Sequence, residues 1–250
     1  MDLEDFLESV VKETNANAGA YSANFSPGTP VHAAPFFGRA DVASYATVGL
    51  NPAPAEFQQG RWPATAMPTA DHLSRLLQYF ANPNVPYYKS WFGPWERALN
   101  CLGRSYFQDT AHFDLSPRAT IPVGGCPDRQ RFVKMVAADL KWFFALLAGR
   151  TEIRGLLVAG SSWCITRTGK AGAVHLDRII REAGPSFGFA LAKAKVLSRS
   201  GTRLATYSLS RPGGDNIPVF FCGASPSSNS PEVLVQAVQD HAAMLKHLGF

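Results

Sequence analysis

The chain has 250 residues, of which 46% are hydrophobic and 12% aromatic, so wholesale disorder is excluded because ample material is present for a packed core. No apolar run reaches the ~20 residues of a membrane-spanning helix, and the acidic N-terminal sequence MDLEDFLESVVKE resembles neither a secretory signal nor a transit peptide. We therefore expect a cytoplasmic protein with no membrane association.

The formal net charge of +5 is unevenly distributed along the chain. Residues 1–125 contain 8 Lys and Arg against 11 Asp and Glu, a net charge of −3, whereas residues 126–250 contain 16 against 8, a net charge of +8. A basic half favours a polyanionic partner such as nucleic acid. The alternative is an ordinary solvated basic surface.

The first half of the chain shows periodic apolar segments separated by stretches rich in Gly, Pro, Ser and Asn. The elements expected here are a helix at 2–13, an extended wrapping segment at 14–40, a strand at 43–50, helices at 70–81 and 92–102, and a strand at 112–115.

The second half begins with the longest predicted helix, which Asp128 is expected to cap. Two apolar runs around Ser200-Gly201 alternate as a β-hairpin does. The elements expected here are a helix at 129–148, a strand at 154–159, a helix at 172–182, a hairpin at 190–209, a strand at 217–222 and a helix at 231–247.

Four apolar strands, each followed by a loop and a helix, predict a three-layer αβα sandwich with a central, mostly parallel four-stranded sheet. The hairpin is expected as an insertion, and residues 1–250 as one domain in which 1–40 form the N-terminal helix and wrapping segment. Ligands of such folds bind at the carboxyl ends of the strands. That rule selects the loops 51–62, 114–122, 160–164 and 223–230.

Neither a metal ion nor a cofactor is expected. The four cysteines form no CxxC pair, and the six histidines form no HxxxH or HxE pair, so zinc sites with these spacings are absent from the sequence. The chain also lacks GxxxxGK[ST], and no GxGxxG follows a predicted strand, which argues against nucleotide binding.

Two of the selected loops contain residues suited to chemistry. Asn51 ends the first strand and precedes Pro52, which places a neutral amide on a stiff turn. An amide orients a water molecule but cannot take its proton, although Asn-Pro is also a common turn. The last loop, GASPSSNS, offers hydroxyl and backbone N–H groups that suit a phosphate, or alternatively an ordinary helix cap.

In this order, and with the middle strand HFDLSPRAT, these loops resemble the uracil-DNA glycosylase superfamily, whose members carry a GxNP or GxDP motif after the first strand and a Pro-Ser motif after the last. The run Gly49-Leu50-Asn51-Pro52-Ala53 is most similar to the GINPG motif of the mismatch-specific uracil/thymine branch. The resemblance covers residues 43–245. It implies an enzyme, a DNA glycosylase that flips a base out of DNA and hydrolyses its N-glycosidic bond. We expect it to act as a monomer.

The resemblance also implies roles for individual residues. Asn51 matches the residue that holds the attacking water. Ser225 stands where the family usually has His or Asn, which weakens the expected stabilisation of the leaving base. The residues expected to contact the base are Ala53, Phe57, Trp62, Asp114 and Ser225, with Trp62 or Phe57 stacking on it unless both pack in the core. The residues expected to contact DNA are Arg118, Ser161, Pro226, Ser227, Ser228 and Asn229, the last as a wedge.

Two positions bear on the substrate. Ala53 replaces a bulky residue of strict uracil enzymes and leaves room beside the pyrimidine C5. Asp114 replaces an Asn of uracil readers, and a carboxylate only accepts hydrogen bonds, which suits the N4 amino group of cytosine. Both favour cytosine or C5-modified cytosine, as in anti-phage members that excise glucosylated hydroxymethylcytosine. The alternative for Asp114 is a structural carboxylate bonded to backbone N–H groups or to Arg118.

No selected loop offers an obvious nucleophilic lysine, since the nearest, Lys170, lies beyond the third loop. We therefore expect a monofunctional glycosylase in base excision or phage defence. The alternatives are a uracil/thymine mismatch repair glycosylase and a catalytically weak DNA-binding module on the same fold. A serine or cysteine hydrolase built on Gly160-Ser161-Ser162-Trp163-Cys164 is disfavoured, because the GxSxG spacing is missing.

Overall fold

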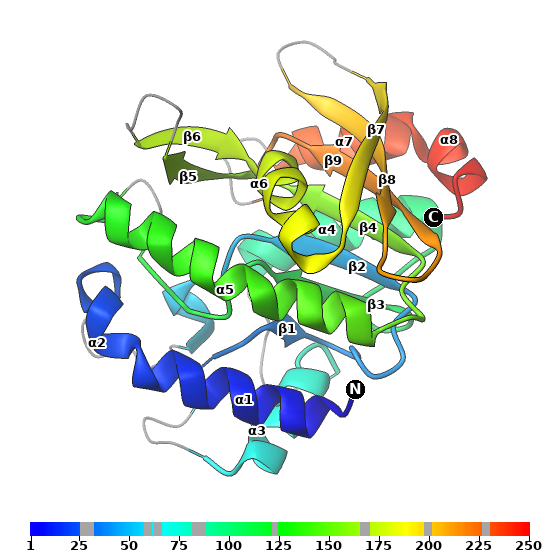
Figure 1. The fold of residues 1–250 in the computed structure, drawn as a ribbon. Helices are drawn as coiled ribbons and strands as arrows, with labels where there is room; N and C mark the ends of the chain where they lie inside the picture. Colours follow the sequence, from blue (N-terminus) through cyan, green and yellow to red (C-terminus); the bar gives the residue numbers. More distant parts are fainter. Residues whose placement is uncertain are drawn as a thin grey trace.

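The fold was obtained as a computed structural model (Figure 1). The residues that it describes are 1–25, 33–57, 62, 67–81, 89–121, 125–165, 171–197, 202–226 and 231–250. Seven strands form the main sheet in the order β1-β3-β2-β4-β9-β8-β7, and two further strands form a separate sheet.

Four neighbouring strands of the main sheet are parallel, as predicted. They are β3 (Thr110–Asp114), β2 (Tyr45–Gly49), β4 (Gly155–Ala159) and β9 (Asn216–Cys222), in that order across the sheet. Every residue of β2, β3 and β4 is buried. Burial on both faces explains why these strands read as continuous apolar runs rather than as alternating ones.

The remaining strands of the main sheet are antiparallel. The short β1 (Phe36–Phe37) pairs with β3 at one edge. At the other edge, β8 (Leu204–Ser210) pairs with β9, and β7 (Ala190–Val196) pairs with β8. The predicted hairpin at 190–209 is therefore present but is not an insertion. It extends the central sheet, because β8 is joined to β9 by a short turn and pairs with it along its whole length.

A second hairpin was not predicted. The strands β5 (Ser161–Ile165) and β6 (Ala171–His175) pair with each other, where the sequence indicated a loop at 160–164 and a helix from 172. Gly160 has a φ of 98°, a left-handed conformation that Gly adopts readily, and it turns the chain out of the main sheet after β4. The helix α6 begins only at Leu176 and ends at Ala183.

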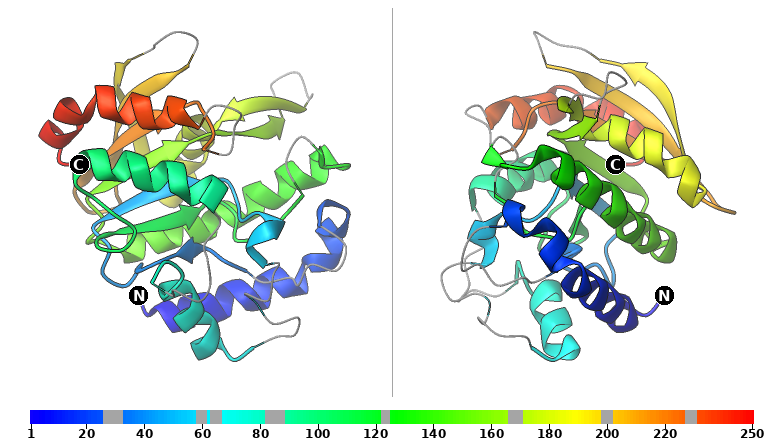
Figure 2. Two further views of the ribbon diagram at one scale, coloured as in Figure 1. Left: turned by 180° about the vertical axis from the view of Figure 1, so that it is seen from behind. Right: turned by 60° about the vertical axis from the view of Figure 1, so that its left-hand side comes forward.

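Helices cover both faces of the sheet (Figures 1 and 2). On the face turned forward in Figure 1 lie α5 (Arg129–Gly149) and α6, with α1 (Leu3–Ala16) beside them. On the opposite face lie α4 (Lys89–Leu102), α7 (Glu232–Asp240) and α8 (Ala242–His247). The short helices α2 (Ala18–Tyr21) and α3 (Thr69–Leu77) complete the N-terminal side. The architecture is an α/β sandwich around a large mixed sheet.

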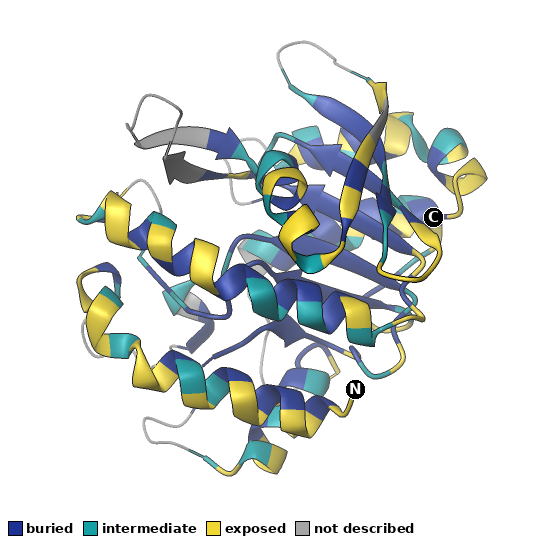
Figure 3. Cartoon of the chain, viewed as in Figure 1, coloured by how far each residue is buried: buried dark blue, intermediate teal, exposed yellow. Residues whose placement is uncertain are grey.

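Local sequence signals explain where the main helices begin. Asp2 accepts hydrogen bonds from the backbone N–H groups of Glu4 and Asp5 at the start of α1. Asp128 caps α5 by accepting from the N–H of Arg131, as predicted. Figure 3 shows the buried stripes of α1 and α5 turned toward the sheet. Among the described residues, no helix is both long and apolar enough to cross a membrane.

Candidate functional site

A pocket with a volume of about 350 Å³ lies at the carboxyl ends of the parallel strands. β2 and β4 are neighbours, but the chain leads from β2 through α3 to α4 on one face of the sheet, and from β4 through the β5–β6 hairpin to α6 on the other face (Figures 1 and 2). The connecting loops diverge at such a switch point and leave a crevice between them. The pocket is within the size range of small-molecule sites.

Five of the predicted site residues line this pocket. They come from the ends of all four parallel strands: Asn51, Ala53, Asp114, Ser161 and Ser225. The loops that the sequence selected after the four parallel strands therefore each contribute to this pocket, and the fold brings together residues from distant parts of the chain.

The aromatic wall of the pocket was not predicted. It is made by Phe37 of β1, Trp91 and Phe92 of α4, and His112 of β3. His112 stacks near Phe37 with ring centroids 6.3 Å apart and meets Phe92 edge-on at 5.1 Å. One signal for His112 was present, because residues two apart in a strand share a face and Asp114 was already a candidate. Phe37, Trp91 and Phe92 could not be predicted, because β1 and α4 are brought to the pocket only by the tertiary fold.

The predicted stacking residues Trp62 and Phe57 do not line the pocket. Trp62 is 5% exposed and packs with its ring centroid 5.3 Å from that of Phe57 and 5.3 Å from that of His72. Both side chains therefore pack in the hydrophobic core, which was the alternative to stacking on a base. An aromatic surface for a base is instead available from Phe37, Trp91 and Phe92.

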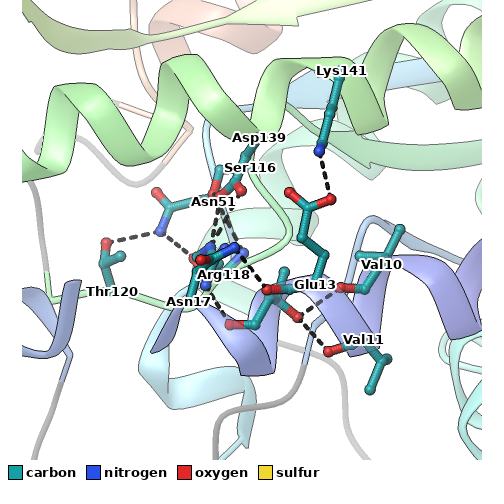
Figure 4. Close-up of polar contacts among 11 residues, drawn as sticks. Val10, Val11, Glu13, Asn17, Asn51, Ser116, Arg118, Thr120, Asp139 and Lys141 are labelled. Atoms are coloured by element: carbon teal, nitrogen blue, oxygen red, sulfur yellow. Dashed lines mark hydrogen bonds and ion pairs between the residues drawn. The ribbon is translucent and has the colours of Figure 1, made fainter. Parts of the chain in front are cut away.

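Asn51 is held in one orientation by the loop that follows β3 (Figure 4). Its Nδ2 donates to the carbonyl oxygen of Arg118 at 2.9 Å and to Oγ1 of Thr120 at 2.8 Å. A carbonyl oxygen can only accept, so the amide nitrogen must face it, and the Thr120 hydroxyl uses its own hydrogen on the carbonyl of Ile121. Oδ1 is thereby turned away as an acceptor, and no residue in the described part of the chain donates to it.

The prediction that Arg118 contacts DNA is wrong. Arg118 is 2% exposed, and its guanidinium donates from Nε to Asp139 at 2.9 Å and from Nη1 to the carbonyl of Thr14 at 2.7 Å. A buried charge must be paired, and this pairing ties the loop after β3 to α5 and α1 (Figure 4). Arg118 therefore supports the backbone that holds Asn51 and is not available to a phosphate.

A chain of buried polar groups runs from the helix side of the sheet to the pocket. The hydroxyl of Tyr106 lies 2.6 Å from Oγ1 of Thr47, which lies 2.7 Å from Nδ1 of His112. Nε2 of His112 lies 3.3 Å from Oδ1 of Asp114. Parallel pairing places Thr47 beside His112 and Gly49 beside Asp114, so these positions share one face of the sheet.

Asp114 ends this chain at the pocket wall. It is 3% exposed, and its Oδ2 has no hydrogen-bond partner among the described residues. Burial raises the pKa of the Asp114 carboxyl above its ordinary value, and the neighbouring His112 opposes this only in part. Neither predicted alternative partner, backbone N–H or Arg118, is bonded to it. A buried carboxyl with one unused oxygen in a cleft is a candidate for function.

Gly49 makes room for this arrangement. A Cβ atom at residue 49 would lie 2.9 Å from Nε2 of His112 and 3.0 Å from Oδ1 of Asp114, closer than such contacts normally allow. The glycine of the Gly-Leu-Asn-Pro motif is therefore required by the two side chains on the next strand.

The loop after β9 is described only in part. Ser225 is half-buried and lines the pocket, and Pro226 is buried, so its ring packs inward and is not exposed to DNA. Ser161, from the start of β5, is exposed at the pocket edge. The predicted DNA-contacting residues Ser227, Ser228 and Asn229 lie outside the described residues.

The charge of the pocket differs from what the composition suggested. Its described lining contains two acidic side chains, Asp114 and Glu56, and no Lys or Arg. Glu56 is 2% exposed and accepts a hydrogen bond from the hydroxyl of Tyr79. Three basic residues that follow these strands, Arg61, Arg167 and Lys170, fall outside the described residues.

The described residues contain no group of three His, Cys, Asp or Glu side chains placed to hold a metal ion. Comparison with protein-family models, with curated proteins and with solved structures found no match for this chain.

Replacement of Arg118 by Gln is expected to lower the free energy of unfolding by about 3–5 kcal/mol, because it leaves Asp139 buried without its partner. Urea unfolding followed by circular dichroism measures the change. Arg97→Gln is the matched control, since the Arg97–Glu232 pair is 50% and 73% exposed and contributes at most about 1 kcal/mol. Equal losses in both variants would contradict the supporting role of Arg118.

Replacement of Gly49 by Ala is expected to lower the free energy of unfolding by about 1–3 kcal/mol, because His112 and Asp114 must move to admit the Cβ. Thermal unfolding of the variant tests this. Gly19→Ala serves as the control, since a Cβ there meets nothing within 4 Å. A Gly49→Ala protein as stable as the wild type would show that His112 and Asp114 can move without loss of stability.

Proposed function

We propose that the protein is a monofunctional DNA glycosylase, which hydrolyses the N-glycosidic bond of a pyrimidine flipped out of DNA into the pocket. The observation that carries this proposal is the meeting of Asn51 and Asp114 in one pocket, each at the end of a parallel strand. The resemblance to the uracil-DNA glycosylase superfamily requires the motifs after the first and last parallel strands to face one site. Asn51 and Ser225 satisfy that requirement.

Asn51 suits the task of orienting the attacking water. With Nδ2 fixed by the carbonyl of Arg118 and the hydroxyl of Thr120, the free Oδ1 accepts a hydrogen from water and directs the water oxygen toward the sugar C1′. A neutral amide does not take the proton and stabilises a cationic sugar less than a carboxylate does. We therefore expect slow hydrolysis, or a base that leaves readily.

The pocket wall favours a cytosine-type base. Ala53 adds only a methyl group to the lining, which leaves space beside C5 of a bound pyrimidine. Asp114 lines the same wall and has one oxygen without a partner among the described residues, and Trp91 and Phe92 offer aromatic surface for stacking. C5-modified cytosine, including the glucosylated form in phage DNA, fits these features, and defence against phage would be the corresponding role. Uracil or thymine in mismatches would instead indicate base-excision repair.

No lysine is present in the described lining of the pocket, so these lining residues provide no amine for a covalent intermediate with the sugar. The product is then a free base and an uncut abasic strand. A DNA-binding module on the same fold is the second candidate, favoured by Ser225 in place of the usual His or Asn.

The decisive experiment is mass detection of free base released from duplexes that contain uracil, a thymine mismatch, hypoxanthine, cytosine, 5-hydroxymethylcytosine or its glucosylated form. The wild-type protein is expected to release a C5-modified cytosine. Asn51→Ala is expected to lower this rate by about 100-fold or more, because the water loses its anchor, while DNA affinity is retained.

Asn100→Ala, on the exposed side of α4, is the matched control and is expected to release base at the wild-type rate. Wild-type protein that binds DNA but releases no base from any duplex of the set would reject the glycosylase and favour the binding module.

DNA binding is expected to weaken steeply with added salt, because residues 126–250 carry a net charge of +8 that would neutralise phosphates and release their counterions. Fluorescence anisotropy with a labelled duplex at several salt concentrations measures the slope. An affinity that is independent of salt would contradict a phosphate-binding surface.

A further inference from the structure

The buried polar chain behind Asp114 has no part in the mechanism described so far. Its four members, Tyr106, Thr47, His112 and Asp114, are each at most 3% exposed. They come from the turn after α4 and from β2 and β3, and they connect through contacts of 2.6, 2.7 and 3.3 Å. The chain ends at Asp114, which lines the pocket and whose buried Oδ2 has no partner among the described residues.

We propose that Asp114 is the proton donor to the departing base and that His112 is the residue that positions it. The inference rests on the proposed glycosylase function and adds the group that activates the base. It assigns Asp114 a different role from the carboxylate acceptor that the sequence suggested.

The Tyr106–Thr47 and Thr47–His112 contacts can be donated in either direction, and one of the two directions suits this assignment. When the Tyr106 hydroxyl donates to Thr47 Oγ1, the Thr47 hydroxyl donates to Nδ1 of His112, and the ring hydrogen is then on Nε2. Nε2 then points its hydrogen at Oδ1 of Asp114, 3.3 Å away, which leaves Oδ2, the oxygen without a partner, to carry the proton of an uncharged Asp114. The opposite direction would place that proton on Oδ1, between the two side chains, where it is unavailable to a ligand.

The surroundings favour the uncharged acid. Burial raises the pKa of Asp114, and the neighbouring His112 lowers it only in part. The other carboxyl of the described lining, Glu56, accepts a hydrogen bond from the hydroxyl of Tyr79. The neighbouring Trp91 and Phe92 of α4 carry no charge, and the described lining contains no Lys or Arg. An uncharged Asp114 also removes the repulsion between a carboxylate and the electron-rich leaving base.

The step balances as follows in atoms and charge. As the C1′–N bond breaks, its electron pair moves into the base, and the Oδ2 proton of Asp114 moves to a ring nitrogen or carbonyl oxygen of that base. The water oriented by Asn51 bonds to C1′ and loses one proton to solvent. The Asp114 carboxylate accepts the Nε2–H of His112 and regains a proton from solvent before the next turnover. One water molecule is consumed.

This role gives the pocket a reason to prefer cytosine. N3 of cytosine has a lone pair that an acid can protonate, which converts the base into a better leaving group. N3 of uracil carries a hydrogen instead, and uracil departs as an anion. A proton donor at Asp114 therefore compensates for the weak electrostatic help from the neutral Asn51.

The test is the pH dependence of single-turnover base release from duplexes containing glucosylated 5-hydroxymethylcytosine, 5-hydroxymethylcytosine or uracil. Catalysis needs protonated Asp114, so the wild-type rate is expected to be constant at low pH and to fall about tenfold per pH unit above the pKa of that carboxyl. Because burial raises this pKa, the fall begins above the ordinary range of an aspartic acid. A wild-type rate that rises with pH overturns the proposal without any variant.

Asp114→Asn is expected to lower the rate for the modified cytosines by about 100-fold or more and to abolish the fall with pH, because an amide has no proton to transfer. Asp109→Asn makes the same chemical change just before β3, at the opposite end of the strand from the pocket, and is expected to leave the rate and profile unchanged. An Asp114→Asn variant with the rate and pH profile of the wild type overturns the proposal.

The His112→Phe variant distinguishes a role of His112 in positioning Asp114 from a role in packing alone, because Phe fills similar space but has no N–H group. Without the Nε2–H donor the Asp114 carboxylate is less stabilised, so the rate should drop and its fall should move to higher pH. His112→Gln, which retains an N–H donor at a similar reach, should restore the wild-type profile. A drop in rate with no movement of the profile in His112→Phe assigns a structural role to His112 and overturns the proposal. Wild-type protein that releases no base from the three duplexes rejects the proposed function itself, and the inference with it.

Discussion

The site depends on one constraint of the parallel sheet. β2 lies between β3 and β4. The chain after β2 reaches α4 on one face of the sheet by way of α3, and the chain after β4 reaches α6 on the other face by way of the β5–β6 hairpin (Figures 1 and 2). The backbone therefore separates at the carboxyl ends of these two strands. Asn51, Asp114, Ser161 and Ser225 share one pocket for this reason alone, since their places in the sequence are far apart.

Two buried polar systems give that pocket its chemistry. Beside β3, the Arg118–Asp139 pair anchors the loop whose carbonyl group fixes the amide of Asn51. On the sheet face covered by α4, the contacts from Tyr106 to His112 lead to one oxygen of Asp114, and the other oxygen is buried without a partner among the described residues. A buried ion pair contributes little net stability, and its effect here is to hold the pocket-lining side chain of Asn51 in one position. A buried polar network restricts its members in the same way.

Several residues show where prediction from the sequence succeeded and where it failed. The strand ends were located correctly, because a buried parallel strand is a continuous apolar run and its end is marked by turn residues such as Asn51-Pro52. Arg118 was misassigned because a basic residue in a loop has the same sequence appearance whether it meets a phosphate or a buried carboxylate. Trp62 was misassigned because an aromatic side chain packs equally well in a core or on a base. The β5–β6 hairpin was missed because short segments rich in small residues have no decisive periodicity.

The sequence by itself determined the class of fold, the edge of the sheet where the site lies, and Asn51, Ala53, Asp114 and Ser225 as members of one pocket. These features follow from local patterns of burial and turn formation, which act over a few neighbouring residues. Only the tertiary structure decided which side chains face that pocket and in what state. The burial of Asp114, its unused Oδ2 and its contact with His112 depend on the pairing of β2 with β3 and on the cover provided by α4. A pKa and a hydrogen-bond direction are set by every group that surrounds a side chain, and those groups come from segments far apart in the chain.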